Sequence, residues 1–391
     1  LSYNLCDIVK QAETLSPKMD ATENQRARCP VKVMQKNMLE FMEEGDMRFV
    51  IPAYQRLYSW NETQCEELWL DILRAARGKH NHFLGTVLYN VAYEGKTPDH
   101  IEIIDGQQRL TSVSLVILAL ARYLESHPRS CSADTSDAAT LISRYLVMSE
   151  ADGSDPITKL LPSHHDASPY DAVIRGGDGN PMSSITRNLS FFQEKMAEDD
   201  FDYEQLLEGL RRLTTIFVEV DDFRDAQPIF ESVNSKGMPL NVADMVRNYL
   251  LLTESHDEQT RLFEEYWKVS QEMFAPDPGS LKLNTGIKSW LAIRLKGARI
   301  QSAEQTYASF KRYVEDVYQG DKEPILRELR GFCLMWAENY RYHGVKKYRS
   351  GSDWAKLGAP ALTSGYKLKK ADNEEYAREF REKLRNADSR W

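Results

Sequence analysis

Cysteine is scarce in this chain, and its few residues are not arranged for cross-linking or metal binding. The 391 residues include five cysteines, which lie far apart and form no Cys-x-x-Cys pair. This spacing argues against a disulfide framework or a zinc site and fits a reducing cytosol. No apolar run approaches the roughly 18 residues that span a bilayer, and no basic segment precedes an apolar one at the start. We therefore expect a cytoplasmic protein without membrane contact.

Positive charge is not in excess either. The chain has 50 Lys and Arg residues against 59 Asp and Glu residues, a net charge of −9. A protein that binds nucleic acid over a broad surface usually has an excess of positive charge, which this chain does not have. Any DNA contact is therefore expected to be local, or to be made by a part of the protein that is not in this sequence. The eight histidines are scattered, and neither His-Glu-x-x-His nor Gly-x-Ser-x-Gly occurs. The motifs of common zinc peptidases and serine hydrolases are thereby excluded.

The hydrophobic pattern predicts an α+β fold, in which a small mixed sheet with helices is followed by a mainly α-helical domain. Length alone suggests about two or three domains. We expect an N-terminal extension at 1–30, a sheet-containing domain at 31–225 with an irregular, partly helical insertion near 128–188, and a helical domain at 226–391. Strands are predicted at 48–52, 82–89, 101–104 and 217–220, and helices at 33–42, after Asn61 and at 110–124.

The main candidate site is the segment Asp105-Gly106-Gln107-Gln108-Arg109, which joins an apolar strand to an apolar helix. The first turn of a helix has unsatisfied N–H groups and partial positive charge, so it can bind phosphate. Arg109 would add a bidentate cation, and Asp105 could hold a metal or orient a water. Alternatively, Asp105 caps the helix, Gly106 permits the turn, and the other side chains are solvated surface. The segment is not a Walker A loop.

Two further segments carry candidate residues. In 51–60, aromatic residues alternate with Gln55 and Arg56, a pattern that can stack a base and clamp phosphate, or form a turn packed into the core. In 228–248, a helix is expected to end near Asn234, turn at Gly237 and restart with Asn241 as its cap. Side chains of this segment could face a ligand, although capping explains most of them.

Taken in order, four segments resemble a known protein family. IPAYQRLYSW, HFLGTVLY, IIDGQQRLTS and IFESVNSKGMPLNVADMVRNYLL are similar to the GmrS-like half of GmrSD-type, modification-dependent restriction proteins. SspE-like anti-phage proteins share this module. The resemblance runs from about Arg48 to Leu252, and Thr111-Ser112 stands where Thr-Thr is more usual.

The resemblance implies a fold similar to ParB and sulfiredoxin, and hydrolysis of nucleoside triphosphates coupled to restriction of modified foreign DNA. The motifs carried over are Asp105 to Arg109 (DGQQR), Tyr54 to Arg56 (YQR), and Asn234, Gly237, Asp244 and Asn248. We expect Mg²⁺ or another divalent cation as cofactor, bound at Asp105, and catalytic roles for Asp105, Gln107, Gln108 and Arg109. The residues expected to bind the nucleotide are Tyr54, Gln55, Arg56, Trp60, Gly106, Thr111, Asn234, Lys236, Gly237, Asp244 and Asn248.

The resemblance also implies DNA and a nuclease as partners. Full-length members commonly continue into an HNH-type nuclease domain, marked by a histidine near an Ile-x-Pro segment, and no such segment occurs here. We therefore expect DNA cleavage to depend on a C-terminal or separate nuclease domain. The residues leave open whether this chain forms a homo-oligomer. The alternative is a module that senses DNA or nucleotide without hydrolysis. A nuclease built on the ParB-like fold alone is less favoured, because no two-metal carboxylate cluster is visible.

Overall fold

The computed structural model consists of two compact units, one ending at Val233 and the other beginning at Asn234. The structure describes residues 31–43, 47–94, 97–127, 137–149, 155–221, 226, 229, 241–274, 280–295 and 302–343.

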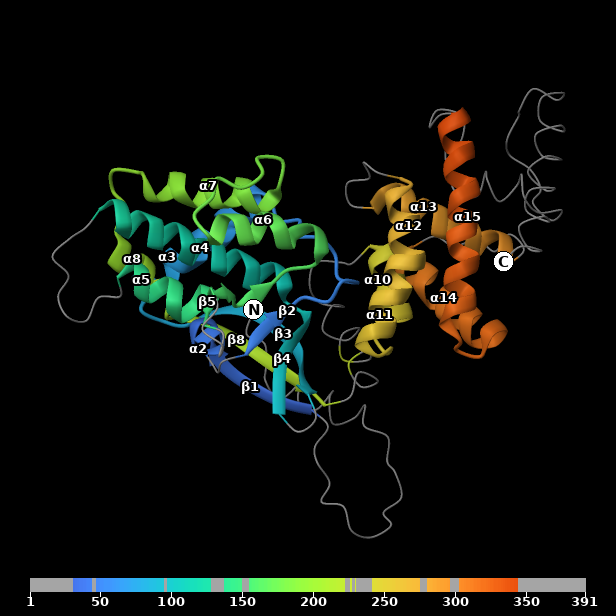
Figure 1. Cartoon of the computed structure of the whole chain (residues 1–391), viewed down its shortest axis with the longest axis horizontal. Helices are drawn as coiled ribbons and strands as arrows, with labels where there is room; N and C mark the ends of the chain where they lie inside the picture. Colours follow the sequence, from blue (N-terminus) through green and yellow to red (C-terminus); the bar gives the residue numbers. More distant parts are fainter. Residues whose placement is uncertain are drawn as a thin grey trace, which may run out of the picture. The chain divides into compact units, whose positions relative to one another are not determined.

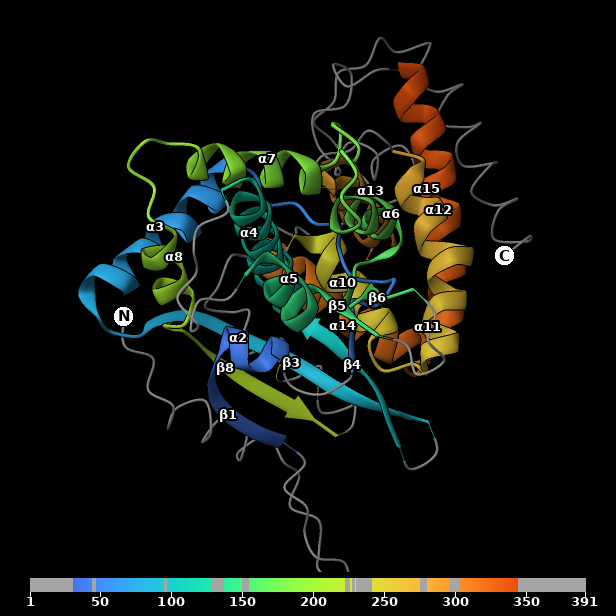
Figure 2. The ribbon, with the colours of Figure 1, turned by 60° about the vertical axis from the view of Figure 1, so that its left-hand side comes forward.

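A six-stranded mixed sheet organises the first unit (Figures 1 and 2). Its strand order is β1-β8-β3-β4-β2-β7. The strands are β1 (Val31–Asn37), β2 (Arg48–Val50), β3 (His82–Glu94), β4 (Thr97–Asp105), β7 (Leu160–Leu161) and β8 (Leu213–Val220). β3 is central and pairs in parallel with β8 and antiparallel with β4. Seven of the eight β8 residues are buried, which explains its nearly continuous apolar sequence. The strands predicted at 48–52, 82–89, 101–104 and 217–220 are confirmed, although β3, β4 and β8 are four or five residues longer than predicted and β2 is two residues shorter.

Helices cover one face of this sheet (Figure 1). They are α3 (Glu62–Gly78), α4 (Gln107–Ser126), α6 (His164–Ile174), α7 (Ser184–Met196) and α8 (Tyr203–Leu210). α3 packs against α8, and α4 packs against α7. The helix predicted after Asn61 is confirmed: Asn61 and Gln64 form a reciprocal capping box, which stabilises a helix start by about 1 kcal/mol.

α4 is buried along most of its length, as its apolar sequence predicts. Its two buried serines, Ser112 and Ser114, donate to the carbonyls of Gln108 and Leu110, each at 2.9 Å. These bonds satisfy hydroxyls that would otherwise be costly to bury.

The helix predicted at 33–42 is wrong in its first half. Val31–Asn37 is strand β1, antiparallel to β8, and only α2 (Met38–Glu43) is helical. The change from strand to helix occurs at Asn37. Its side-chain nitrogen donates to the carbonyls of Arg211 (2.6 Å) and Leu213 (2.9 Å), and its side-chain oxygen accepts from Leu39 N (2.7 Å) at the start of α2. Pairing with a distant strand therefore overrides the helical periodicity.

α2 delivers Phe41 into the core of the first unit. The ring of Phe41 stacks on Phe217 of β8, with 4.0 Å between ring centroids, and lies 5.1 Å from Phe49 of β2. All three side chains are at most 1% exposed. This cluster joins helix α2 to two strands of the sheet, β2 and β8.

The segment predicted to be an irregular insertion is more ordered than expected where the structure describes it. It contains α5 (Ala138–Leu141), the π-helix η1 (Ile142–Leu146), β5 (Val147–Met148), β6 (Ile157–Thr158), β7 and α6. Residues 175–181 form a loop. β7 extends the main sheet through parallel pairing with β2. Two-residue strands carry too little pattern to be recognised from sequence.

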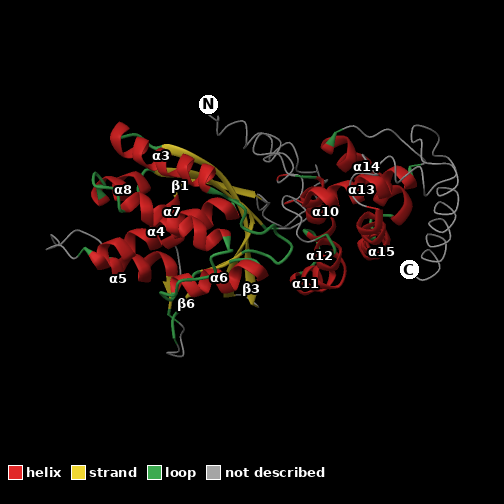
Figure 3. Cartoon of the chain, turned by 90° about the horizontal axis from the view of Figure 1, so that it is seen from above, coloured by secondary structure: helices red, strands yellow, loops and turns green. Residues whose placement is uncertain are grey.

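The described elements of the second unit are all helices (Figure 3). They are α10 (Val242–Leu251), α11 (His256–Leu262), the π-helix η2 (Phe263–Trp267), α12 (Lys268–Glu272), α13 (Leu281–Arg294), α14 (Ala303–Tyr318) and α15 (Lys322–His343). Trp267, Trp290 and Phe310 are buried at its core, as expected for tryptophans in a packed helical domain. The prediction of an α+β fold, with a mixed sheet first and helices after it, is confirmed.

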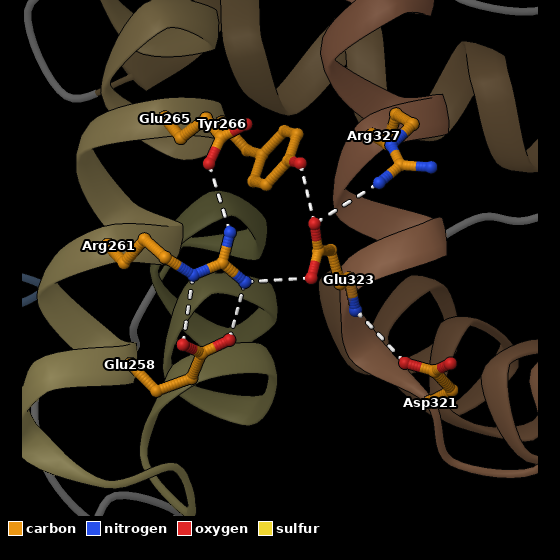
Figure 4. A network of polar contacts seen from close by, with 7 residues as sticks. All are labelled: Glu258, Arg261, Glu265, Tyr266, Asp321, Glu323 and Arg327. Carbon is orange, nitrogen blue, oxygen red and sulfur yellow. Dashed lines mark hydrogen bonds and ion pairs between the residues drawn. The ribbon is translucent and has the colours of Figure 1, made fainter.

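A polar network joins α11 and η2 to the start of α15 (Figure 4). Arg261 pairs with Glu258 and Glu265 and reaches Glu323 of α15 at 2.7 Å. Tyr266 donates to the other oxygen of Glu323, also at 2.7 Å. Hydrogen bonds from Arg261 and Tyr266 to the carboxylate lower the pKa of Glu323 to about 2.

Among the described residues, no helix has the length and apolarity to cross a membrane.

Candidate functional site

The candidate site begins where β4 ends at Asp105 and α4 starts at Gln107, with Gly106 between them. Gly106 has a φ of 97°, and a Cβ added there would lie 2.7 Å from Val87 Cγ2 and 3.3 Å from the Thr86 carbonyl. Only glycine satisfies both requirements without strain. No side chain caps this helix start, so its first N–H groups are not satisfied by a cap. The strand–turn–helix predicted from the sequence is therefore present.

Two arginines lie near the Asp105 carboxylate. Desolvation raises the pKa of Asp105 above its ordinary value, whereas the charge of Arg109, a hydrogen bond with the Gly106 backbone and the charge of Arg56 oppose the rise. Asp105 and both arginines keep partial solvent exposure. The turn thus combines one carboxylate with two permanent cations, at the N-terminus of a 20-residue helix.

Arg109 is held against the neighbouring strand β3. Its Nη1 donates to the carbonyl of Leu84 at 3.1 Å. The guanidinium occupies the space beside Gly85, where an added Cβ would lie only 2.1 Å from Nη1.

The side chains of Gln55 and Gln107 form a buried chain beneath the turn. Gln107 Nε2 donates to Gln55 Oε1 at 3.3 Å, and Gln55 Nε2 donates to the carbonyl of Ile104 at 2.8 Å. The two residues are 7% and 6% exposed. Their amides support the end of β4 in this structure instead of facing solvent.

Gln108 fixes the loop that carries Arg56. Its Oε1 accepts from the backbone N–H of Ser59 at 2.9 Å, and its Nε2 donates to the carbonyl of Leu57 at 3.1 Å. Gln108 is 6% exposed, so both ends of its amide are bound to protein backbone. The geometry makes Gln108 a residue that positions the loop.

The same loop is anchored from a second side through Tyr58. Its hydroxyl hydrogen-bonds with Ser112 of α4 at 2.7 Å and accepts from Asn188 of α7 at 3.0 Å. Its backbone N–H donates to Asp166 of α6 at 2.6 Å. Three helices therefore determine where Arg56 and Leu57 lie.

Three other predicted nucleotide-binding residues are less accessible. Tyr54 and Thr111 are each 1% exposed, and Trp60 is partly buried against the core. A base could stack on Tyr54 only after the loop moved. Leu57, at 39% exposure, is the accessible apolar side chain of this loop.

Residues 36–251 match the model of a protein family described as the GmrSD restriction endonuclease, N-terminal domain, and the match covers more than half of the chain. The chain belongs to this family. The family resemblance drawn from the four motifs is therefore confirmed. The chain has no match among curated proteins.

The GmrSD match extends through α10, which ends at Leu251 and belongs to the second unit. As predicted, Asn241 caps α10: its side chain accepts from Asp244 N at 2.9 Å. Asp244 also pairs with Arg247 at 2.9 Å, and Asn248 is 2% exposed. A ligand role for Asp244 and Asn248 stays a prediction. Asn234, Lys236 and Gly237 lie outside the described residues.

Sequence reasoning missed several residues that build this GmrSD-family site. Gly85 offered a signal, because glycine inside a strand often marks a bulge or a close approach. Ser112, Asp166 and Asn188 offered none, since nothing in their local sequence indicates that they hold a loop at Tyr58.

Proposed function

We propose that the first unit binds a nucleoside triphosphate at the Gly106 turn and hydrolyses it, and that this turnover is coupled to restriction of foreign DNA. The observation that carries the proposal is the pair of arginines, Arg56 and Arg109, beside Asp105 at the start of α4. A helix N-terminus with adjacent guanidinium groups is suited to bind phosphate.

The chemistry requires that negative charge be stabilised as it develops on the phosphoryl oxygens. Arg109 would supply this stabilisation from a fixed position, because Leu84 holds its guanidinium. Arg56 would supply a second cation from the loop fixed by Gln108. Asp105 would orient the attacking water or hold a divalent cation. Gln107 and Gln108, both bonded internally, would position these groups without touching the nucleotide.

A magnesium ion fits this arrangement if the nucleotide brings most of the ligands. In the described part of the chain, no three His, Cys, Asp or Glu side chains gather as a metal site. Mg²⁺ is commonly bound by one or two carboxylates together with substrate phosphates and water. Asp105 would provide the carboxylate, and the bound ion would neutralise phosphate charge. We expect little affinity for Mg²⁺ alone.

Restriction itself requires a nuclease and DNA. We propose that an HNH-type nuclease domain, covalently attached or separate, cuts the DNA, and that nucleotide turnover in this unit controls the cut. The net charge of −9 favours a local DNA contact over a broad basic surface.

A non-hydrolysing sensor is the second candidate. Because the amides of Gln107 and Gln108 are bonded within the protein, few side chains remain for catalysis, whereas two arginines suffice for binding. A sensor of this kind would show affinity for nucleotide without phosphate release.

The deciding experiment measures phosphate release from each common nucleoside triphosphate with Mg²⁺, for the wild-type chain and Arg109→Ala. Arg122→Ala is the matched control, because Arg122 lies on the same helix but donates to the carbonyls of Val173 and Gly177. Arg109→Ala should lower turnover by roughly 100-fold or more, and Arg122→Ala should not.

Each outcome bears on the proposal. Normal turnover in Arg109→Ala would show that the assignment of the site is wrong. Binding without turnover in the wild type would favour the sensor. If the wild-type chain neither binds nor hydrolyses nucleotide, DNA recognition is the better account of its function.

A further inference from the structure

We infer that Gly85 is a positioning residue of the candidate site: it leaves the space in which the Arg109 guanidinium is held. Its importance for nucleotide chemistry rests on the function proposed above. The geometric part of the inference does not, and it can be tested separately.

The backbone around Gly85 departs from regular strand structure. In the pairing of β3 with β8, Phe83 lies opposite Thr214 and Gly85 opposite Thr215, so Leu84 is an extra residue. Gly85 has a φ of 112°. We call this one-residue irregularity the bulge; like β-bulges in general, it redirects backbone groups, and such irregularities are frequent beside functional sites.

The bulge lies next to the start of α4. Pairing of β3 with β4 begins only at Leu88, opposite Asp105, so the part of β3 before Leu88 extends past the end of β4. Arg109, in the first turn of α4, meets β3 there and donates to the carbonyl of the extra residue Leu84 at 3.1 Å. The strand irregularity and the cation are therefore in direct contact.

The missing side chain of Gly85 is what gives Arg109 its space. A Cβ at this position would lie 2.1 Å from Arg109 Nη1, 3.0 Å from Cζ and 3.6 Å from Nη2. Any side chain would force the guanidinium, the flexible end of Arg109, to leave its place against the Leu84 carbonyl. Pre-positioned charge is what makes such a cation effective in stabilising a transition state.

Backbone conformation alone could also require glycine here, and Gly176 separates the two explanations. Gly176 has a φ of 86°, yet an added Cβ would have no atom within 4 Å. Gly176→Ala therefore reports the cost of a positive φ without a collision. Gly85→Ala should show that cost and, in addition, the displacement of Arg109.

The test is a double-mutant cycle of Gly85→Ala and Arg109→Ala, with Gly176→Ala as control, read by thermal unfolding. Gly85→Ala should lower the Tm by about 2–4 °C more than Gly176→Ala does, because the displaced guanidinium loses its hydrogen bond to the Leu84 carbonyl. In the Arg109→Ala background this excess should disappear, because the colliding group is gone. An equal loss of Tm in both backgrounds would overturn the inference. If Gly85→Ala does not fold, the double variant should regain folded protein, and its failure to do so would also overturn the inference.

Nucleotide turnover provides the second readout. Gly85→Ala should lower it roughly tenfold or more, and adding Gly85→Ala to Arg109→Ala should cause no further loss. Further loss in the double variant would show that Gly85 acts on something other than Arg109. If the wild type neither binds nor hydrolyses nucleotide, the proposed function fails, whereas the unfolding cycle still decides the role of Gly85.

Discussion

Replacing Gln108 with methionine removes the two hydrogen bonds from its amide to the backbone of Leu57 and Ser59 and keeps a side chain of similar volume, while the contacts of Tyr58 remain. In the wild-type protein, the side-chain amide of Gln108 accepts a hydrogen bond from Ser59 N at 2.9 Å and donates one to Leu57 O at 3.1 Å. Gln108 is only 6% exposed, whereas its partner Leu57 is 39% exposed, so water can partly replace the bond at Leu57. Ser59 is exposed, so its N–H can turn to solvent.

The expected magnitude follows from these two bonds. Each internal hydrogen bond contributes about 0.5–1.5 kcal/mol net, so the free energy of unfolding should fall by about 1–3 kcal/mol. Arg56 precedes Leu57 directly, so a looser Leu57–Ser59 segment would also loosen the backbone that carries this cation near Asp105. We expect nucleotide affinity to weaken roughly tenfold, which corresponds to about 1.4 kcal/mol.

Three measurements test this reasoning: denaturant unfolding, hydrogen exchange of the 56–59 backbone, and the Kd for nucleotide with Mg²⁺. Gln259→Met is the matched control, since Gln259 is 3% exposed and donates to the carbonyls of Leu252 and Glu254 in the second unit. It should lower stability without changing the Kd. Unchanged exchange at 56–59 in Gln108→Met, or an equal loss of affinity in Gln259→Met, would refute the loop-positioning role.

Two further predictions concern titration. Burial raises the pKa of Cys65 and Cys333 to about 12. Because the thiolate is the reactive form, both side chains should resist iodoacetamide at about pH 8 until the protein unfolds. Peptide mass spectrometry checks this, and labelling of either in the folded protein would contradict it. Because the pKa of Glu323 falls from 4.5 to about 2 on folding, its stabilisation is present above about pH 4.5 and disappears as the pH approaches 2. In chemical unfolding, Glu323→Gln should therefore be less stable than the wild type at neutral pH and equally stable near pH 2. If the variant and the wild type differ in free energy of unfolding by the same amount at every pH, this ion pair is not the cause.

Much of the local structure could be predicted because its signals lie close together in the sequence. The capping box of α3 depends on Asn61 and Gln64, three residues apart. The apolar run of α4 and the glycine between strand and helix also act locally. These signals were sufficient to locate the Asp105–Arg109 turn and to suggest the family.

Local signals failed where a distant partner decided the outcome. The segment Val31–Asn37 has a pattern compatible with helix, but an available edge on β8 makes it a strand. The short strand β7 exists only because β2 offers it a parallel partner. In both cases, hydrogen bonding across the sheet outweighs a weak local preference.

The sequence by itself determined that a strand–glycine–helix turn would place a carboxylate beside arginine, because neighbouring residues suffice to specify that turn. Only the tertiary structure decided what the surrounding side chains do. Gln108 contacts Leu57, 51 residues away, and Arg109 contacts Leu84, 25 residues away. The side-chain amide of Gln108 can bind phosphate or backbone equally well. Which of these it binds depends on the groups that folding brings within about 3 Å of it.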